Sequence, residues 1–598
     1  MSEKEIAWDL SEIFAGCDDP KISESMDALL KDTDEIVKGY RGKINTNSFS
    51  AQNLFNLLKK QEKILADMEE LKVFSVNLFN ANMTVPETEN LYNKFKDFHS
   101  TILKKLAFLE IEIGKLINEN PQLIDDESLI NYKNYLFKVK RRFPFKLSVK
   151  EEKLILEKDQ YGVIAWEQLR DSWISSRKFK VIVEGEEKII SFSDFMPLAM
   201  HPDRETRLSV FKSVSDLLGK DESIISSALR NICSDWVKMV NLRNYNSHMH
   251  QSLIDFNTKQ NIIDNLMKTI EENIHIYHRF LKIKAKLLNL PKLHGADIWG
   301  RLPFKKKYTW EETKELTIRL FSNFDKEFGE IVSDIFERHH IDASTREGKS
   351  GGAYCSPWFN GRTVFILTSF KGLINDVLPL AHELGHGIHC YLSSREQTFI
   401  NYIAEKLLAE SASNFGELLL AEHLLKFAES SKDKITILTN ELTGTGSVLF
   451  YVSARMWFEQ SLYDAIQKGE FLDGNTISEY WCSARDKIFG DSVDWFDEMK
   501  WLWMTTPHYF FSDTRFYNYP YVYGKLFVYA LYKSYKNEGE SFIPKFKKLL
   551  SLGDSLSPEE LGKIVGMDVT KPDFWQLGIK QFEEFVEELE KLIELPGE

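Results

Sequence analysis

A chain of 598 residues and 69.7 kDa is longer than one hydrophobic core usually serves, so its length predicts roughly two to four packed units. Hydrophobic residues make up 43% of the chain, against only 16 prolines and 30 glycines, which excludes a largely disordered protein and a small disulfide scaffold. The formal net charge of −14 repels polyanions, so nucleic acid is not an expected partner.

Apolar residues recur every three or four positions through most of the chain, which predicts a mainly α-helical fold. Apolar stripes over residues 54–71 and 582–592 predict two long amphipathic helices. Residues 557–560, Ser-Pro-Glu-Glu, combine a hydroxyl cap, a proline for the first turn and a carboxylate that can reach back to the cap. A third helix is therefore expected to start there.

Two β-branched runs, 179–183 and 188–192, flank Glu184–Glu187 and predict a β-hairpin. We place a domain boundary just after this hairpin. The N-terminal helical domain then covers residues 1–195, and a second domain, which carries the motif described next, covers residues 196–598.

The β-branched run 363–368 predicts a short strand directly before the most informative helix of the chain, at residues 376–389. This helix contains His382, Glu383 and His386 in the pattern H-E-x-x-H. Residues four apart share a helix face about 6 Å apart, so both imidazoles can converge on one metal ion. Glu383 is rotated about 100° from His382, which lets its carboxylate reach a water on that metal without binding the ion itself.

The same helix contains residues that disfavour a helix. Pro379 falls in its first turn, where a proline is tolerated, if residue 375 or 376 is the cap. Gly385 and Gly387 each cost about 1 kcal/mol relative to alanine, which is expected where something approaches the helix closely. Taken alone, the motif also fits two ordinary histidines on an amphipathic helix.

A catalytic zinc needs a third protein ligand and an open position for water. Residues 404–417 read as a helix with small side chains around a glutamate, as expected where it packs against the metal helix. The candidate ligands, in order of preference, are Glu410, Glu405 and Glu417. Asn414 is a candidate to accept a hydrogen bond from a ligand histidine, and His389 is expected beside the ligands or facing the substrate.

The five cysteines are odd in number and form no C-x-x-C pair, which predicts free thiols in a reducing compartment. The N-terminus carries acidic residues where a secretory signal has positive charge followed by an apolar run, and no apolar run reaches the roughly 20 residues that cross a bilayer. These features predict a cytoplasmic protein without a membrane span. The basic stretches 138–142 and 305–307 are interpreted as solvated surface, and the oligomeric state stays open.

The sequence resembles the thimet oligopeptidase family (M3) of zinc metallopeptidases, and most closely its oligoendopeptidase F branch. The segments that carry the resemblance are residues 8–10, 355–357, 380–386, 409–413, 507–509 and 516–521. The resemblance implies a helical, two-lobed zincin-like fold with a deep substrate channel and a small β-sheet beside the active-site helix. It also implies one Zn²⁺ per chain, bound by His382, His386 and Glu410, with Glu383 as the general base.

The aromatic-rich stretch 501–519 predicts core packing when taken alone. In the family, a histidine and nearby tyrosines from this region donate hydrogen bonds to the substrate and to the developing oxyanion. The resemblance therefore points to His508 and to Tyr517 or Tyr519. Some relatives place glycines within this segment, whereas here none occurs between His508 and Gly524, so both tyrosines stay candidates.

The expected function is that of a metalloendopeptidase, which hydrolyses internal peptide bonds of short, unstructured oligopeptides. An extended peptide is expected to pair with the edge of the strand at 363–368. Two alternatives stay open. A zinc exopeptidase would need a charged group to hold a free terminus, and a helical peptide-binding or scaffolding protein would carry its histidines incidentally.

Overall fold

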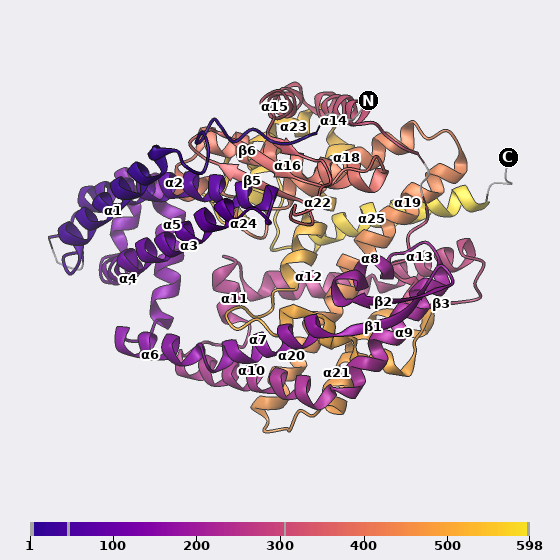
Figure 1. The fold of residues 1–598 in the computed structure, drawn as a ribbon. Coiled ribbons are helices and arrows are strands. Elements are labelled where there is room, and N and C mark those ends of the chain that lie inside the picture. The colour runs from indigo at the N-terminus through magenta and orange to yellow at the C-terminus, as the bar shows by residue number, and fades with distance from the viewer. Residues whose placement is uncertain (1–4, 45–47, 304–305, 595–598) are drawn as a thin grey trace. The chain divides into compact units, whose positions relative to one another are not determined.

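The structure is a computed structural model that describes residues 5–44, 48–303 and 306–594. Residues 1–4 of the N-terminal segment and Lys305 of the lysine run lie outside these ranges. Helices make up most of the described chain and the sheets are small, which confirms the mainly α-helical prediction (Figure 1). In the part that the structure describes, no helix has the length and apolar character needed to span a membrane.

The chain divides into two compact units, each assembled from three separate segments. Unit 1 contains Met1–Pro144, Lys305–His423 and Ser534–Asp568. Unit 2 contains Phe145–Phe304, Leu424–Lys533 and Val569–Glu598. Neither unit corresponds to one run of sequence, and the division of the chain near residue 195 stays a prediction.

Unit 1 combines the N-terminal helices with the helix of the H-E-x-x-H motif. Its α-helices are α1 (Pro20–Tyr40), α2 (Ala51–Ala81), α3 (Pro86–Leu106), α4 (Phe108–Glu119), α5 (Lys133–Arg142), α14 (Trp310–Phe324), α15 (Lys326–Glu337), α16 (Ile374–Glu396), α17 (Phe399–Tyr402), α23 (Ile543–Ser551) and α24 (Pro558–Ile564), and α18 (Ser411–Lys426) begins in it. Its strands are β4 (Ile341–Asp342), β5 (Tyr354–Trp358) and β6 (Thr363–Leu367).

The three strands of unit 1 form one sheet in the order β4-β6-β5, and β5 and β6 contact α16. The predicted strand at 363–368 is therefore present beside the motif helix as β6. It is the central strand, parallel to β4 and antiparallel to β5, and all of its residues are buried. The structure does not support the expectation that a peptide pairs with the edge of this strand, because β5 pairs along one whole edge and β4 pairs with Ile366 and Leu367 on the other.

The hydrophobic core of unit 1 joins its N-terminal helices to this sheet. Ile64 and Phe74 of α2 belong to the same buried cluster as Trp358 of β5 and Phe365 of β6. The indole N–H of Trp358 also donates to Glu70 of α2 at 2.9 Å. The N-terminal helices thus support the sheet that lies next to α16.

Unit 2 is also helical. Its α-helices are α6 (Val149–Asp159), α7 (Val163–Ser176), α8 (Phe195–Ala199), α9 (Arg204–Lys220), α10 (Glu222–Leu242), α11 (His250–Asp255), α12 (Gln260–Glu272), α13 (Ile274–Leu287), α19 (Ser431–Gly446), α20 (Val452–Gln467), α21 (Gly474–Phe489) and α25 (Pro572–Glu594), and α22 (Tyr519–Glu538) begins in it. Its strands are β1 (Lys178–Val183), β2 (Glu186–Ser191), β3 (Leu293–His294) and β7 (Val493–Asp494).

Several local predictions are confirmed. The hairpin is present as β1 and β2, and its turn contains two residues, Glu184 and Gly185, which both have positive φ as a tight hairpin turn requires. The long helices are present as α2 and α25, and α24 begins with a reciprocal capping box between Ser557 and Glu560.

The start of α16 differs from the prediction. The carboxylate of Asp376 accepts the backbone N–H groups of Lys371 and Leu373, both at 2.9 Å, and this closes the turn from which the helix begins at Ile374. Pro379 therefore lies in the helix interior rather than in its first turn. The proline removes one backbone hydrogen bond from α16 shortly before the motif.

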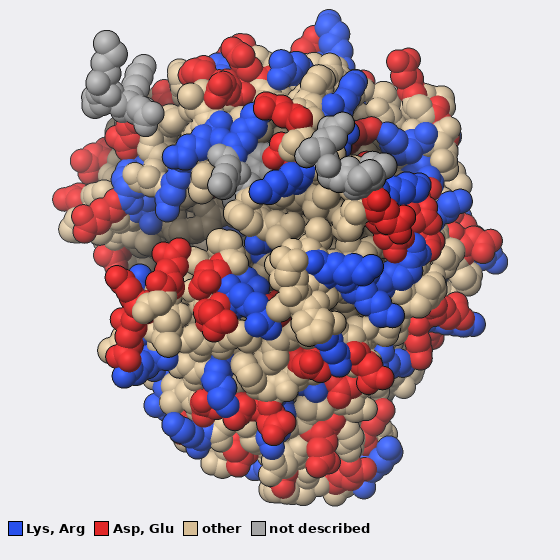
Figure 2. All heavy atoms as spheres, turned by 90° about the vertical axis from the view of Figure 1, so that its right-hand side faces the viewer, with Lys and Arg blue, Asp and Glu red and all other residues tan. Residues whose placement is uncertain are grey.

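The surface carries both signs of charge. On the face in Figure 2, acidic and basic side chains are interspersed. Lys306 and Lys307 are exposed, as expected for solvated surface. The interpretation of residues 138–142 as solvated is wrong for Lys138, whose side chain is only 14% exposed and pairs with the buried Glu405 and the half-buried Asp554.

Candidate metal centre

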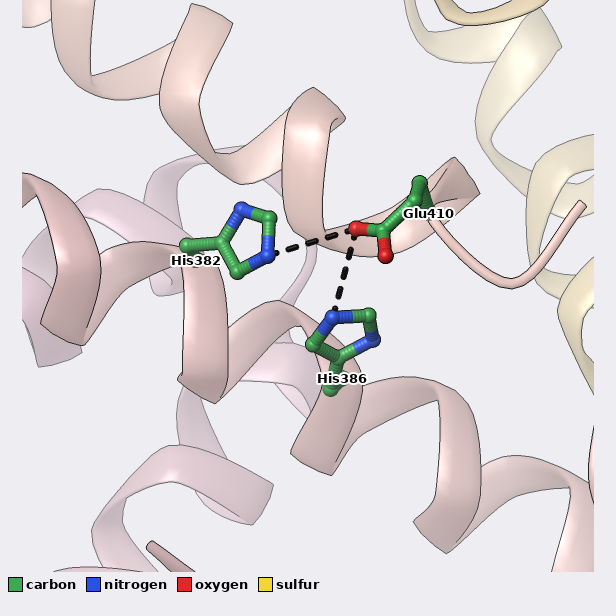
Figure 3. A group of neighbouring side chains, drawn as sticks. All are labelled: His382, His386 and Glu410. Atoms are coloured by element: carbon green, nitrogen blue, oxygen red, sulfur yellow. Dashed lines mark ion pairs between the residues drawn. The ribbon is translucent and has the colours of Figure 1, made fainter. Parts of the chain in front are cut away.

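Helix α16 presents His382 and His386 on one face, as their spacing predicts. Figure 3 shows one carboxylate oxygen of Glu410 facing a ring nitrogen of each histidine. Oε2 of Glu410 lies 3.2 Å from Nε2 of His382 and 3.3 Å from Nε2 of His386. The donor atoms of the three residues all lie within 4.8 Å of one another. The structure thus brings together the three residues that the sequence analysis chose first.

Glu410 does not lie in a helix, although residues 404–417 were predicted as one. Residues 403–410 are irregular backbone and turns, and α18 begins at Ser411. The carbonyl of Glu410 accepts the N–H of Asn414, and Ser413 Oγ donates to Glu410 Oε2 at 2.7 Å. Glu410 thus directly precedes α18, and Ser413 of that helix holds one of its carboxylate oxygens.

A close contact between α16 and α18 depends on glycine. A Cβ at Gly385 would lie 2.5 Å from the carbonyl oxygen of Ala412 and 2.6 Å from Cα of Ser413. A Cβ at Gly416 would lie 3.1 Å from the carbonyl oxygen of Ala381. The prediction that small residues let these two segments pack tightly is confirmed at both helices.

The other candidate ligands take different positions. Glu405 is buried and pairs with Lys138 at 2.9 Å. Glu417 Oε1 lies 3.0 Å from Nδ1 of His382. Asn414 was expected to accept a hydrogen bond from a ligand histidine; at Nδ1 of His382 it is Glu417 that lies in this position. Glu417 lies seven residues after Glu410, two helical turns, and this spacing could have indicated it.

His389 lies one turn beyond His386 on α16. Burial, followed by the charge of His386, lowers the pKa of its imidazole to about 3, so the ring is neutral at physiological pH. It lines the same cavity as the three clustered residues but does not belong to the cluster itself. This agrees with the expectation that His389 lies beside the candidate ligands.

The cluster is electrostatically coupled. Burial disfavours the charged ring of His382, but Glu410 and Glu417 outweigh it and raise the pKa of the imidazole to about 10. Burial opposes ionisation of Glu410, but the two histidines hold the pKa of its carboxyl far below the usual range. The two carboxylates therefore favour a protonated His382 ring in the metal-free chain, and a metal ion would displace that proton.

These residues fit a divalent metal ion such as zinc. Zinc prefers tetrahedral nitrogen and oxygen ligands at about 2.0–2.1 Å, which places neighbouring donor atoms about 3.3 Å apart. The two measured separations, 3.2 and 3.3 Å, agree with this spacing. The hydrogen bond from Nδ1 of His382 to Glu417 would fix the ring with Nε2 toward the ion.

A cavity of about 390 Å³ opens beside the cluster. Its lining residues are Ala353, Tyr354, Cys355, Pro357, His382, Glu383, His386, His389, Cys390, Tyr402, Ile403, Ala404, Ala409 and Glu410. Glu383 is 7% exposed, and burial raises the pKa of its carboxyl. Strand β5 contributes to the wall and is an edge of the sheet among the described strands. The cavity thus combines the cluster, a carboxylate and a strand edge.

The remaining predicted residues, His508, Tyr517 and Tyr519, lie in unit 2, so the structure does not test their place at the metal centre. The ring of His508 stacks on that of Tyr517, with centroids 5.7 Å apart. Tyr519 is fully buried, and its hydroxyl lies 3.2 Å from Oγ of Ser252. Burial, followed by the nearby arginines, lowers the pKa of His508 to about 4, so its ring is neutral and can donate a hydrogen bond.

Two further residues hold this segment and were not predicted. Nε2 of His508 lies 3.2 Å from the hydroxyl of Tyr521, which follows Tyr517 by four residues. Buried Glu459 on α20 accepts the N–H of Phe516 at 2.7 Å, where Phe516 has a φ of 54°. The repeated tyrosines of this segment could have indicated Tyr521. The contact from Glu459 could not be predicted from the local sequence, because α20 is a separate element.

Comparison with known proteins agrees with this geometry. The family model described as peptidase family M3 matches residues 198–581, and this range contains the H-E-x-x-H motif and Glu410. Oligopeptidase PepF of Bacillus subtilis (strain 168) is 25% identical over 596 residues, which cover 98% of this chain and 87% of PepF.

Solved structures share the fold. A structure from Chlamydophila abortus has a TM-score of 0.86 at 22% identity and covers 99% of both chains. Oligoendopeptidase-F from Enterococcus faecium has a TM-score of 0.70 at 20% identity, covering 96% of this chain and 99% of that one. The resemblance stated from the sequence is thus confirmed. The chain belongs to peptidase family M3 and is a metalloendopeptidase.

Proposed function

We propose that this protein is a zinc-dependent endopeptidase that hydrolyses internal peptide bonds of short, unstructured oligopeptides. The observation that carries the proposal is the convergence of two imidazole nitrogens and one carboxylate oxygen within 4.8 Å, on the wall of a cavity that Glu383 also lines. The names of the relatives, oligopeptidase and oligoendopeptidase, support short peptides as the substrate class.

In this proposal His382, His386 and Glu410 hold one Zn²⁺ per chain. A bound zinc ion supplies positive charge that polarises the scissile carbonyl and favours deprotonation of the attacking water. Glu383 accepts that proton as the water oxygen bonds to the carbonyl carbon. Glu383 then delivers the proton to the amine as the carbon–nitrogen bond breaks.

The substrate is proposed to bind as an extended strand along β5. This strand lines the cavity and is an edge of its sheet among the described residues, so its backbone groups can pair with a peptide. Tyr354 and Ser356 lie opposite Leu367 and Phe365 and face β6, so the free edge of β5 offers the N–H of Cys355, whereas Pro357 lacks one. Recognition through the backbone predicts broad side-chain specificity.

The segment at 508–521 is proposed to donate hydrogen bonds to the substrate and to the developing oxyanion. Tyr517 is the preferred donor, with His508 beside it, because the hydroxyl of Tyr519 already contacts Ser252 inside the core. One preorganised donor of this kind contributes about 3 kcal/mol to lowering the barrier.

An endopeptidase is favoured over an exopeptidase that grips a terminal carboxylate. All the residues lining the cavity are described, and none of them is a lysine or an arginine. We also propose a cytoplasmic location. The five cysteines are free, which fits a reducing compartment.

The test uses the purified chain and a short peptide blocked at both ends. We expect about one zinc per chain, cleavage at internal bonds, loss of cleavage with a chelator and no cleavage of a folded, disulfide-bonded protein. A chain that binds no metal, or that cuts only peptides with a free terminus, would contradict the proposal.

A further inference from the structure

The third candidate ligand lies at the end of an irregular segment, residues 403–410, which joins α17 to α18. In a helix, the backbone hydrogen-bond ladder fixes the direction of each side chain. Residues 403–409 lack that ladder, and α18 holds Glu410 only from its C-terminal side, through Ser413 and Asn414, so the course of the chain into Glu410 also depends on contacts with the rest of unit 1. This dependence distinguishes Glu410 from His382 and His386.

Buried polar groups from the N-terminal helices hold the chain just before this segment. Glu62 of α2 accepts the N–H of Ile400 at 3.2 Å, and Glu69 of α2 accepts the hydroxyl of Tyr402. The carboxylate of Glu69 also accepts the N–H of Phe359 at 2.9 Å. Helix α2 thus fixes the approach to residues 403–410.

Lys138 of α5 holds the segment itself. Its ammonium lies 2.9 Å from Glu405 Oε2 and also pairs with the carboxylate of Asp554, which follows α23. The side chains of Lys138 and Glu405 are 14% and 2% exposed. Asn134, one turn earlier on α5, donates to the carbonyl of Asp554 at 2.7 Å. The Lys138 contact is thus a buried, charge-assisted anchor five residues before Glu410.

We propose that Lys138 is a positioning residue for the metal centre: through Glu405 it fixes residues 403–410 and so places the Glu410 carboxylate against His382 and His386. This inference rests on the proposed metal site. Lys138 touches none of the three clustered residues in the contacts that the structure gives, and it lies outside the segment 198–581 that the family model matches. The N-terminal helices then contribute to metal affinity as well as to the core.

The test compares Lys138→Met with Lys133→Met. Lys133 lies on the same helix, and its ion pair with Asp125 at 2.8 Å is exposed to solvent, so this variant controls for the loss of a charge from α5. Zinc affinity is measured by competition with a chelator. We expect Lys138→Met to weaken zinc binding by about tenfold or more, and Lys133→Met to leave it unchanged.

A second readout uses the metal-free protein. Backbone hydrogen exchange over residues 403–410 should be faster in Lys138→Met than in the wild type, whereas exchange over α16 should be unchanged. Lys138→Arg keeps the charge and should restore zinc affinity. If Lys138→Met does not fold, Glu405→Gln tests the same anchor with a side chain of the same shape.

The outcomes separate this inference from the proposed function. If the wild type binds no zinc at His382, His386 and Glu410, the proposed function fails. If the wild type binds zinc and a folded Lys138→Met or Glu405→Gln variant binds it with the same affinity, the positioning role is overturned.

Discussion

The segment from His382 to Glu410 in unit 1 and the segment from His508 to Tyr521 in unit 2 are held in different ways. The first has its side chains paired with one another and fixed by a glycine contact between two helices. The second joins a 3-10 turn through irregular backbone to the start of α22, and it leaves Nδ1 of His508 buried without a hydrogen bond among the described residues. A preorganised cluster is suited to holding a metal ion, whereas a buried polar atom without a hydrogen bond can pair with a substrate that binds and dissociates.

Among the substitutions that test this comparison, Glu383→Gln should have the largest effect on activity. The amide cannot accept the proton of the attacking water, so we expect kcat to fall by about 10³-fold, within the range for general acid–base catalysis. Zinc affinity should be unchanged, because Glu383 is not one of the clustered residues. Peptide cleavage and metal content are measured on the same samples. Glu396→Gln, an exposed change at the end of α16, is the control.

Near-normal turnover in a zinc-loaded Glu383→Gln enzyme would remove Glu383 from the role of base. The segment from His382 to Glu410 would then bind the metal ion without accepting the proton, and another residue would have to be the base.

Tyr517→Phe should have the next largest effect on activity, and it tests the segment in unit 2. Loss of one oxyanion donor lowers kcat by about 10²-fold. Tyr519→Phe is the matched control, because it removes a hydroxyl that lies 3.2 Å from Ser252 Oγ within the core. We expect it to lower the free energy of unfolding by about 1 kcal/mol and to leave kcat unchanged. A greater loss of turnover in Tyr519→Phe than in Tyr517→Phe would reverse the assignment.

The two regions also differ in how far the sequence predicts them. His382, Glu383 and His386 are predicted from one helical turn, because their geometry depends only on the helical repeat. Glu410 was the first choice for the third ligand, but its surroundings were predicted incorrectly. Residues 404–410, Ala-Glu-Lys-Leu-Leu-Ala-Glu, are strong helix formers and yet form turns. A buried contact between Glu405 and Lys138, 267 residues away, holds the segment in this form.

The strand at 363–367 illustrates the same limit. Its β-branched residues predict a strand, and the structure confirms it as β6. Its place at the centre of the sheet depends on pairing with Ile341 and Asp342 and with residues 354–358. The composition of a single strand does not reveal which of its edges are occupied, so the edge that can receive a peptide, β5, was not predicted.

Gly385→Ala tests whether the close packing of α16 on α18 is what makes the segment from His382 to Glu410 rigid. The added Cβ would meet backbone atoms of Ala412 and Ser413 at 2.5 and 2.6 Å, and backbone cannot shift aside easily. We expect a loss of about 1–3 kcal/mol in the free energy of unfolding, measured by urea titration of the metal-free protein. Zinc affinity should fall as well, because the displaced residues begin α18 directly after Glu410.

Gly387→Ala is the control, two residues further along the same helix. Its Cβ would meet only the methyl groups of Ile335 and Val364, at 3.0 and 3.1 Å, and these side chains can adjust. The gain in helix propensity, about 1 kcal/mol, should offset that adjustment. Equal destabilisation by both substitutions would show that the contact with α18 is not special.

Glu417→Gln should have the smallest effect, because it changes only the group behind a candidate ligand. The amide oxygen can still accept from Nδ1 of His382, but the negative charge that favours this ring orientation is lost. We expect zinc affinity to fall by about tenfold, as measured by chelator competition. Glu422→Gln, further along α18 and paired with Lys536, should leave it unchanged. Equal affinity in both variants would mean that Glu410 and the two rings alone set the strength of the site, and that its preorganisation ends at the three clustered residues.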